Sequence, residues 1–115
     1  MYKNIDYIYD ATSILEQITG MDVTVESKRK EHDAVMTING QLFFVIAKNE
    51  IRKENEGFLI NLVVPFEGDR CSSIFIAKYI SSDTAKTLKS LRINYLDTSG
   101  NCYIQTKDFL IYVSG

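Results

Sequence analysis

An Asn-Gly pair, Asn39 and Gly40, constrains this chain more than any other short feature. It separates two runs rich in apolar residues, 34–38 and 41–48. Both central positions of a tight two-residue hairpin turn require positive φ, which Asn and Gly adopt most readily. We therefore predict an antiparallel β-hairpin over 34–48. Its second strand is apolar on both faces between 42 and 47, which is typical of a strand in the centre of a covered sheet.

Hydrophobic periodicity predicts helices and further strands around this hairpin. Between Ile5 and Ile18, apolar residues recur at three- and four-residue spacing, as on one face of a helix, and Gly20 ends the pattern. A second helix is predicted from its start and its apolar face. Its candidate N-terminal caps are Ser81, Ser82 and Asp83. Its inward-facing residues are Ile80, Ala85, Leu88 and Leu91. The predicted elements are a helix over 5–18, strands over 21–26, 34–38, 41–48 and 73–77, a helix over 82–91, and strands over 93–96, 102–105 and 109–113.

The segment 50–66 fits two structures. Its apolar residues match a helical stripe and an alternating strand equally well, and its β-branched residues favour a strand. Glu54 and Glu56 favour a helix. A helix also supplies the crossover of a dozen or more residues that two buried parallel strands, 41–48 and 73–77, need between them. We favour the helix, and the order of elements then predicts one α/β domain over residues 1–115, with a mixed sheet flanked by helices.

Composition is that of an ordinary globular domain. The 115 residues are 45% hydrophobic and 24% charged with a net charge of −2, which excludes intrinsic disorder. The longest apolar stretch, 58–66, is interrupted by Asn61 and is shorter than the about 20 residues of a membrane span. No apolar segment follows Lys3, so we expect no signal peptide and a cytoplasmic location. Cys71 and Cys102 are far apart in sequence, which favours two reduced thiols over a disulfide or a zinc site.

The predicted hairpin carries residues that a metal-dependent nuclease site uses. Such sites place an aspartate beside an acid-x-lysine tripeptide, so that two carboxylates hold Mg²⁺ and the lysine helps to activate water. Asp33 opens the hairpin and Lys48 ends it, but the acid position is Ile46, which cannot bind a hard cation. Glu50 and, from the first helix, Glu16 are the remaining candidate acids. Three interpretations stay open: a turn acid and a strand-end cation, a nuclease-like site without activity, and an active Mg²⁺ site.

Basic and aromatic residues form a second group of candidates. Lys86, Lys89 and Arg92 lie near the end of the second predicted helix, where cations complement the helix dipole or contact phosphates. A basic run at 28–30 can extend such an edge. Tyrosines at positions 7, 9, 79, 95 and 103 are interpreted as half-buried core residues or as stacking platforms for bases. His32, the single histidine, leaves a pairing with Cys71 or Cys102 open.

The densest polar segment is Asp97-Thr98-Ser99-Gly100-Asn101. Gly100 permits a left-handed turn, while Asp97 and Asn101 can bind backbone amides. Taken alone, the segment predicts a hairpin turn stabilised by its own side chains.

Together with its surroundings, this segment resembles a known family. The runs Ile74-Phe-Ile-Ala-Lys-Tyr-Ile80, Thr84-Ala-Lys-Thr-Leu-Lys89 and Leu91-Arg-Ile-Asn-Tyr-Leu-Asp-Thr-Ser-Gly-Asn-Cys-Tyr-Ile104 are similar, in this order, to the AbiEi-like antitoxins. These are transcriptional regulators of bacterial abortive-infection toxin–antitoxin systems. The similarity covers about residues 73–104, and its core is Asp97, Gly100 and Asn101. Ser99 and Cys102 stand where the family usually has small residues, often Ala.

The resemblance implies a restriction-endonuclease-like fold, a function and a set of partners. The hairpin then carries a remnant of the nuclease site, formed by Asp33, Lys48 and Glu50, with His32 in place of a proline and Ile46 in place of the second acid. Lys48, Lys86, Lys89 and Arg92 become candidate phosphate contacts, and no cofactor is expected unless Mg²⁺ serves an active nuclease. Relatives usually carry a winged helix, which these residues do not contain, so we expect one module of a longer regulator. The hypotheses are a non-catalytic module that binds DNA or a cognate toxin, a Mg²⁺-dependent nuclease, and a structural domain that forms a homodimer.

Overall fold

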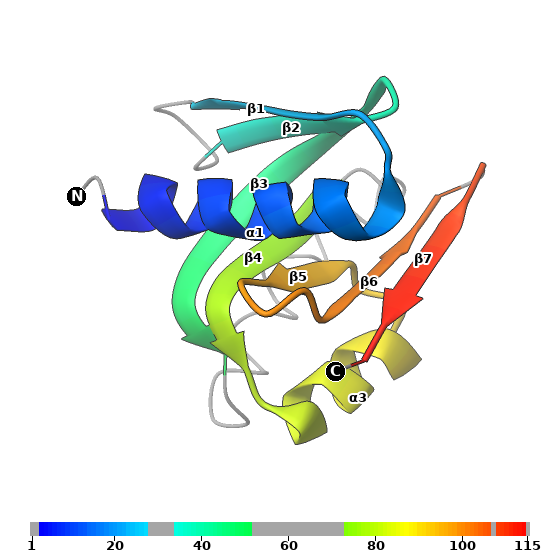
Figure 1. Ribbon diagram of the computed structural model, residues 1–115. Coiled ribbons are helices and arrows are strands. Elements are labelled where there is room, and N and C mark those ends of the chain that lie inside the picture. The colour runs from blue at the N-terminus through cyan, green and yellow to red at the C-terminus, as the bar shows by residue number, and fades with distance from the viewer. Residues whose placement is uncertain (1–2, 28–33, 52–72, 107, 115) are drawn as a thin grey trace.

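A computed structural model describes residues 3–27, 34–51, 73–106 and 108–114. Within them, seven strands form one mixed sheet in the order of the sequence, with helix α1 on one face and helix α3 on the other (Figure 1). The elements are α1 (Lys3–Thr19), β1 (Val23–Ser27), β2 (Ala34–Ile38), β3 (Gln41–Ile51), β4 (Ser73–Ile80), α3 (Ser82–Ser90), β5 (Tyr95–Asp97), β6 (Cys102–Gln105) and β7 (Leu110–Val113). The predicted α/β class with a mixed sheet is confirmed.

The sheet changes direction twice along its width. Strands β1, β2 and β3 pair antiparallel, β3 and β4 as well as β4 and β5 pair parallel, and the last two pairs are antiparallel again. The parallel pairing of β3 with β4 confirms the prediction that these two strands are parallel. Glu50 and Ile51 belong to β3, so the predicted helix over 50–66 is wrong at its start, because the strand extends beyond Lys48 to stay paired with β4. The rest of that segment lies outside the described residues.

The Asn-Gly hairpin forms as predicted. Asn39 and Gly40 have φ angles of 51° and 87°, and Ile38 pairs with Gln41 across the turn. The Asn39 side chain also accepts a hydrogen bond of 3.0 Å from the backbone N–H of Asp22. The turn is therefore tied to the residue that precedes β1.

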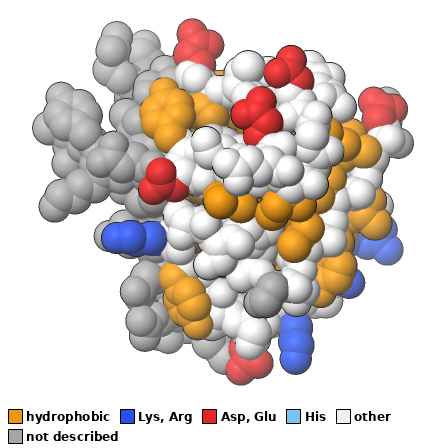
Figure 2. Space-filling view, viewed as in Figure 1, with side chains coloured by type: hydrophobic (Ala, Val, Ile, Leu, Met, Phe, Trp, Pro, Cys, Tyr) orange, Lys and Arg blue, Asp and Glu red, His pale blue; other side chains and the backbone are white. Residues whose placement is uncertain are grey.

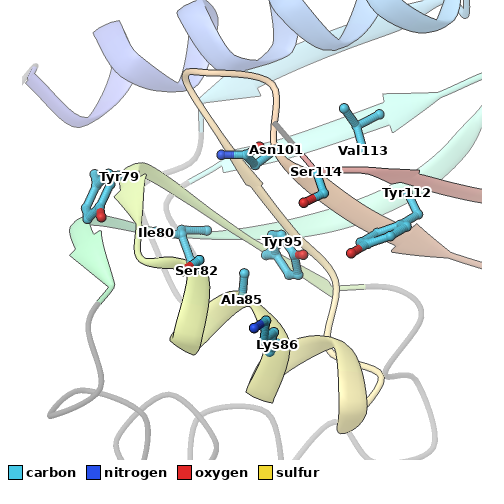
Figure 3. A pocket seen from close by; sticks show the side chains of 10 residues that line it. All are labelled: Tyr79, Ile80, Ser82, Ala85, Lys86, Tyr95, Asn101, Tyr112, Val113 and Ser114. Atoms are coloured by element: carbon cyan, nitrogen blue, oxygen red, sulfur yellow. The ribbon is translucent and has the colours of Figure 1, made fainter.

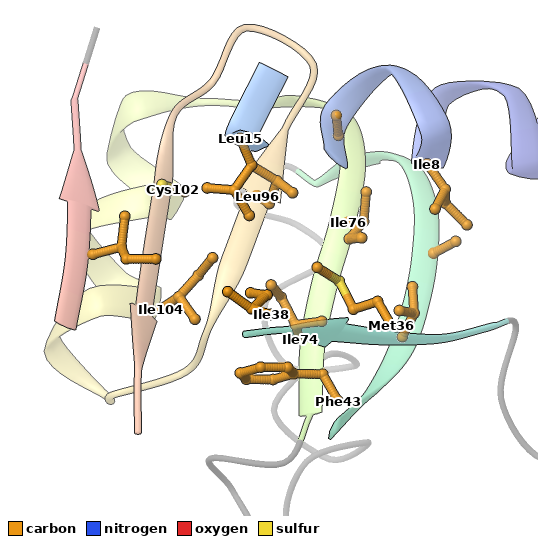
Figure 4. Packing of buried hydrophobic residues seen from close by; sticks show 14 residues of the cluster. Ile8, Leu15, Met36, Ile38, Phe43, Ile74, Ile76, Leu96, Cys102 and Ile104 are labelled. Carbon is orange, nitrogen blue, oxygen red and sulfur yellow. The ribbon is translucent and has the colours of Figure 1, made fainter. Parts of the chain in front are cut away.

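The larger core lies between α1 and the sheet (Figure 4). Its fourteen buried residues are Ile8, Ala11, Leu15, Met36, Ile38, Phe43, Val45, Ala47, Ile74, Ile76, Leu96, Cys102, Ile104 and Ile111. The predicted apolar face of α1 supplies three of them, whereas Ile18, at its end, remains 48% exposed. The alternation predicted for 21–26 is also confirmed, because Met21, Val23 and Val25 pack against this core while Thr24 and Glu26 face outwards.

A smaller core lies on the opposite face, under α3. Its buried residues are Phe75, Ala77, Ile80, Leu88, Ile93, Tyr95 and Tyr103. Ser81 is the cap of α3, since its side chain accepts the N–H of Thr84. Leu91 was expected to face inwards but is 39% exposed, because the helix ends at Ser90 and Leu91 leaves the helical spacing.

The strand predicted over 93–96 begins later, at Tyr95. The N–H of Ile93 closes the end of α3 by donating to the carbonyl of Leu88 at 2.9 Å, and so it is not available to a strand. Neither described helix has the length and apolar composition that crossing a bilayer requires.

Candidate functional site

The β2–β3 hairpin holds the positions predicted for a nuclease-type site. Ala34, the first residue of β2, pairs with Val45 of β3. Asp33, one residue earlier, lies outside the described residues, as does His32. The tripeptide Ile46-Ala47-Lys48 directly follows Val45 in β3. The sequence neighbours of Asp33 and of the tripeptide therefore meet in the hairpin.

The predicted nuclease-type site has few acidic residues that could hold a metal ion. Ile46 is partly buried and packs against the smaller core, so the acid position of the tripeptide offers hydrocarbon instead of an oxygen ligand. Glu50 lies in β3 opposite Tyr79 of β4, and Glu16 is exposed on α1. Within the described part of the chain, no three His, Cys, Asp or Glu residues are grouped so that they could hold a metal ion.

The 97–101 turn is held by its own buried carboxylate. Asp97 is buried and accepts the backbone N–H groups of Ser99 and Asn101, at 2.9 and 3.1 Å, and the side-chain amide of Asn101 at 3.1 Å. The backbone closes the same turn, with bonds from Gly100 to Asp97 and from Asp97 to Asn101. The predicted self-stabilised turn is confirmed.

This turn also lies between α1 and strand β4. Gly100 has a φ of 94°, and a Cβ atom there would lie 2.8 Å from the Cδ1 atom of Ile18 and 2.9 Å from the Cγ2 atom of Ile14, both on α1. Thr98 donates a hydrogen bond of 2.9 Å to the carbonyl of Lys78, close to the end of β4 and the start of α3. The turn is thus fixed on both sides.

Sequence reasoning missed Asn94, which plays the same part at the other end of these strands. Its buried side chain donates to the carbonyl of Ser73 at 3.0 Å and accepts the N–H of Gln105 at 2.9 Å. It therefore links the start of β4 to the end of β6. The available signal was an amide residue inside an apolar run, because a buried amide must be hydrogen-bonded.

The three predicted cations of α3 are all exposed, and they surround its C-terminal half. Lys89 places its Nζ atom 4.7 Å from the centre of the Tyr112 ring, a cation–π contact between α3 and β7. Arg92 has a φ of 61° just after the helix, and its N–H donates to the carbonyl of Lys89. The basic run at 28–30 lies outside the described residues, and the side chain of Lys48 is likewise not described.

Charge is unevenly distributed over the face that carries α1. Acidic side chains lie mainly in the upper half of Figure 2, with one more at the bottom. Lys and Arg side chains lie lower, most of them on the side where Figure 1 shows α3 and one at the left edge. Most cations visible on this face therefore lie on the side of α3, although the whole chain carries a net charge of −2.

A pocket of about 240 Å³ opens beside α3, between the end of β4, the 97–101 turn and β7 (Figure 3). We call it the Tyr95 pocket. Its polar and aromatic lining consists of Tyr79, Ser82, Lys86, Tyr95, Asn101, Tyr112 and Ser114. Of the tyrosines predicted as stacking platforms, Tyr79 is half exposed here and Tyr95 is buried, while Tyr103 is buried behind Tyr95 with ring centres 6.3 Å apart. Tyr9 lies elsewhere, exposed on α1.

Two buried groups near the pocket are held in their protonated forms. Burial, and next the nearby Tyr112, raise the pKa of Tyr95 to about 12. Burial raises the pKa of the Cys102 thiol to about 11, so that this thiol is a poor nucleophile at neutral pH. Cys71, the other candidate partner of His32, lies outside the described residues.

Comparisons with known protein families, with curated proteins and with solved structures found no match for this chain.

Proposed function

We propose that this chain is a non-catalytic, nuclease-like module of a bacterial antitoxin-type transcriptional regulator, and that it binds DNA through α3. The observation that carries the DNA-binding part is the cluster of exposed cations on and after α3, formed by Lys86, Lys89 and Arg92. The regulator family is supported by the similarity of residues 73–104 described above.

The spacing of these cations suits a row of phosphates. Lys86 and Lys89 are three residues apart and therefore share one face of the helix. Phosphate contacts of this kind supply most of the sequence-independent affinity for DNA and position the protein on the duplex. Because the net charge of the chain is negative, binding depends on this local cluster rather than on the charge of the whole molecule.

The hairpin supports a module without catalysis. A Mg²⁺ site of the proposed type needs a carboxylate at the position of Ile46, and the isoleucine side chain provides none. Lys48 stays in this proposal as a phosphate contact, since a lysine serves that role without a metal.

The test is binding of a fluorescent DNA duplex, measured by anisotropy at two salt concentrations with and without Mg²⁺. Each cation that contacts a phosphate contributes about −0.9 to the slope of log K against log salt. We expect Lys86→Gln and Lys89→Gln together to weaken binding and to flatten the slope by about 2. Lys3→Gln removes one positive charge from α1, on the opposite face of the sheet, and is expected to change neither value.

Three results would contradict the proposal. A salt slope that is the same in the double variant and in Lys3→Gln would remove α3 from the interface. DNA cleavage that needs Mg²⁺ and is lost in Asp33→Ala would identify a nuclease. No binding at low salt would leave a protein partner, such as a cognate toxin or a second copy of the chain.

A further inference from the structure

We propose that the Tyr95 pocket binds a single unpaired deoxynucleotide, with the base among the tyrosines and the phosphate at Lys86. The inference rests on the proposed function, and it names the part of the bound DNA that would occupy the pocket. A free deoxynucleoside monophosphate and the unpaired end of a strand present the same chemistry, and the experiment below separates them.

The hydroxyl group of Tyr95 is a buried hydrogen-bond donor at the wall of the pocket. The residue is 2% exposed and lines the pocket, and the structure describes no hydrogen bond to this hydroxyl from any described residue. Figure 3 shows the hydroxyl on the side of Tyr112, whose proximity also contributes to the raised pKa of Tyr95. A buried donor to which none of the described residues offers an acceptor is unfavourable, so this part of the site favours a ligand that brings an acceptor.

The size of the pocket limits what that ligand is. One water molecule takes about 30 Å³, far less than the about 240 Å³ available, so a single bridging water leaves the pocket largely unfilled. Most sites for small molecules measure about 300–1,000 Å³. The Tyr95 pocket lies just below that range, so it suits a group of the size of one base, with the phosphate at its edge, and is too small for a duplex or a folded peptide.

The aromatic lining favours a planar group. Tyr79 and Tyr112 are each about 50% exposed, and Figure 3 shows them at opposite ends of the lining with Tyr95 between them. Bases stack on such rings with little dependence on sequence, because every base has a π face. Every base also carries ring or carbonyl acceptors, which match the donor of Tyr95.

The charge of the lining favours an anion. Lys86 lines the pocket, and Lys89 lies against Tyr112 at its edge. Among the described lining residues none is acidic. The nearby carboxylate of Asp97 is already engaged by Ser99 and Asn101. A phosphate therefore meets cations at this edge without an opposing charge from the described lining.

The experiment titrates the full chain with the four deoxynucleoside monophosphates, with a short single-stranded oligodeoxynucleotide, with the matching duplex and with inorganic phosphate. Affinities come from calorimetry, and amide shifts in two-dimensional NMR spectra locate the site. Tyr95→Phe removes only the hydroxyl and is compared with Tyr103→Phe, a change of the same size in the adjacent ring.

We expect Tyr95→Phe to weaken binding of the monophosphates and of the single strand about fivefold to tenfold, as for the loss of one hydrogen bond. Duplex binding and its salt slope are expected to stay unchanged, and Tyr103→Phe is expected to bind every probe like the parent. If only the single strand binds in this way, an unpaired strand end is the source; if the monophosphates bind as well, the free nucleotide suffices.

The inference fails if Tyr95→Phe and Tyr103→Phe bind the nucleotides equally, or if inorganic phosphate binds as tightly as they do. It also fails, without harm to the proposed function, if the duplex binds with the expected salt slope while no nucleotide shifts the resonances of Tyr95 and its neighbours. Tyr95-dependent nucleotide binding without any duplex binding has the opposite meaning: the pocket stands and the proposed duplex interface is wrong.

Discussion

The two faces of this one sheet are packed with different kinds of side chain. Under α1, fourteen buried residues are aliphatic apart from Phe43 and the sulfur-containing Met36 and Cys102. Under α3, the buried cluster has seven members, two of which are the tyrosines Tyr95 and Tyr103. The hydroxyl of Tyr103 is bonded to Gln105, and that of Tyr95 faces a pocket. The first face resembles an ordinary protein interior, whereas the second is interrupted by polar groups.

If the proposed function is correct, this difference separates residues that stabilise the fold from residues that bind a ligand. An aliphatic interior stabilises the fold in proportion to the apolar area that it buries, and it offers a ligand no specific contact. The face under α3 buries less, but Lys86 and Lys89, the half-exposed rings of Tyr79 and Tyr112 and the buried hydroxyl of Tyr95 lie around one pocket there. The comparison teaches that substitutions on the two faces should separate in their effects, and the following predictions test that separation.

The largest expected effect is a loss of core packing on the α1 face. Leu15 on α1 and Leu88 on α3 are both fully buried, so Leu15→Ala and Leu88→Ala form a matched pair. We expect Leu15→Ala to lower the free energy of unfolding by about 3–5 kcal/mol and Leu88→Ala by about 2–3 kcal/mol, because the smaller cluster beside a pocket relaxes more easily. Urea unfolding measures both values.

The same pair has a second readout, which is binding. Leu88→Ala should weaken nucleotide and duplex binding, since Leu88 anchors the helix that carries Lys86 and Lys89. Leu15→Ala should leave both affinities unchanged at temperatures where it is folded. Equal losses of stability and of affinity in the two variants would show that the α3 face contributes to binding no more than the α1 face does.

The next effect is a loss of stability at high pH, to which each face contributes one group. The pKa of Cys102, on the α1 face, is raised from 9.0 to about 11, and that of Tyr95, on the α3 face, from 10.0 to about 12. The unfolded chain releases these protons at lower pH than the folded chain. The free energy of unfolding therefore falls as pH rises, first above about 9 and then above about 10, with up to about 2–3 kcal/mol from each group.

Urea unfolding between pH 8 and pH 12 measures this loss, with two variants to assign it. Cys102→Ala should remove the part that begins near pH 9, and Tyr95→Phe the part that begins near pH 10. A pH profile that neither variant alters would mean that burial does not hold these groups protonated.

A smaller effect is expected where the 97–101 turn meets α1. Gly100 and Gly40 have similar φ angles, 94° and 87°, but only a Cβ at Gly100 would approach α1, while one at Gly40 would meet nothing within 4 Å. Both Gly→Ala variants therefore carry the strain of a left-handed residue, about 1 kcal/mol, and Gly100→Ala adds the crowding of Ile14 and Ile18. We expect Gly100→Ala to be less stable than Gly40→Ala by about 1 kcal/mol in the same unfolding assay. If the two variants are equally stable, the side chains of α1 move aside for the added Cβ atom, and their contact does not hold the turn in place.

The fold was largely predictable from local patterns. The Asn39-Gly40 turn, the cap Ser81 (one of three candidates) and the alternation of apolar residues depend on neighbours in sequence, and they appear in the structure. The errors lie where long-range pairing decides: β3 continues through Glu50 because β4 runs beside it, and β5 starts late because Ile93 closes α3.

The candidate site was less predictable. The self-bonded turn of Asp97 is local and was predicted, and Tyr95 was among the tyrosines interpreted as core residues or stacking platforms. The role of Asn94 and the pocket that Tyr95 lines were not predicted. Asn94 bonds to residues of two distant strands, and Tyr95 faces a pocket that exists only once α3 and β7 lie on either side of it. Patterns in a single sequence do not indicate which distant residues become neighbours in the fold.

The smallest expected change in stability concerns Arg92, and it tests most directly whether the two faces differ in function. The end of α3 has paired bonds from Ile93 to Leu88 and from Arg92 to Lys89, a Schellman motif whose left-handed position is usually glycine. Arg92 occupies that position at a φ of 61°, which is unfavourable for a residue with a side chain. We expect Arg92→Gly to raise the free energy of unfolding by about 0.5 kcal/mol, because relief of the strain exceeds the added freedom of the unfolded chain.

The same substitution should weaken DNA binding and flatten its salt slope by about 1. Arg92→Ala is the matched control, since it removes the charge but keeps a side chain in the left-handed position, and it should weaken binding without the gain in stability. A variant that binds less and is more stable means that the cation is kept at the expense of the fold, as expected of the functional face. Arg92→Gly with parental affinity would instead make this arginine a solvated helix end, and the DNA-binding edge of α3 would shrink to Lys86 and Lys89.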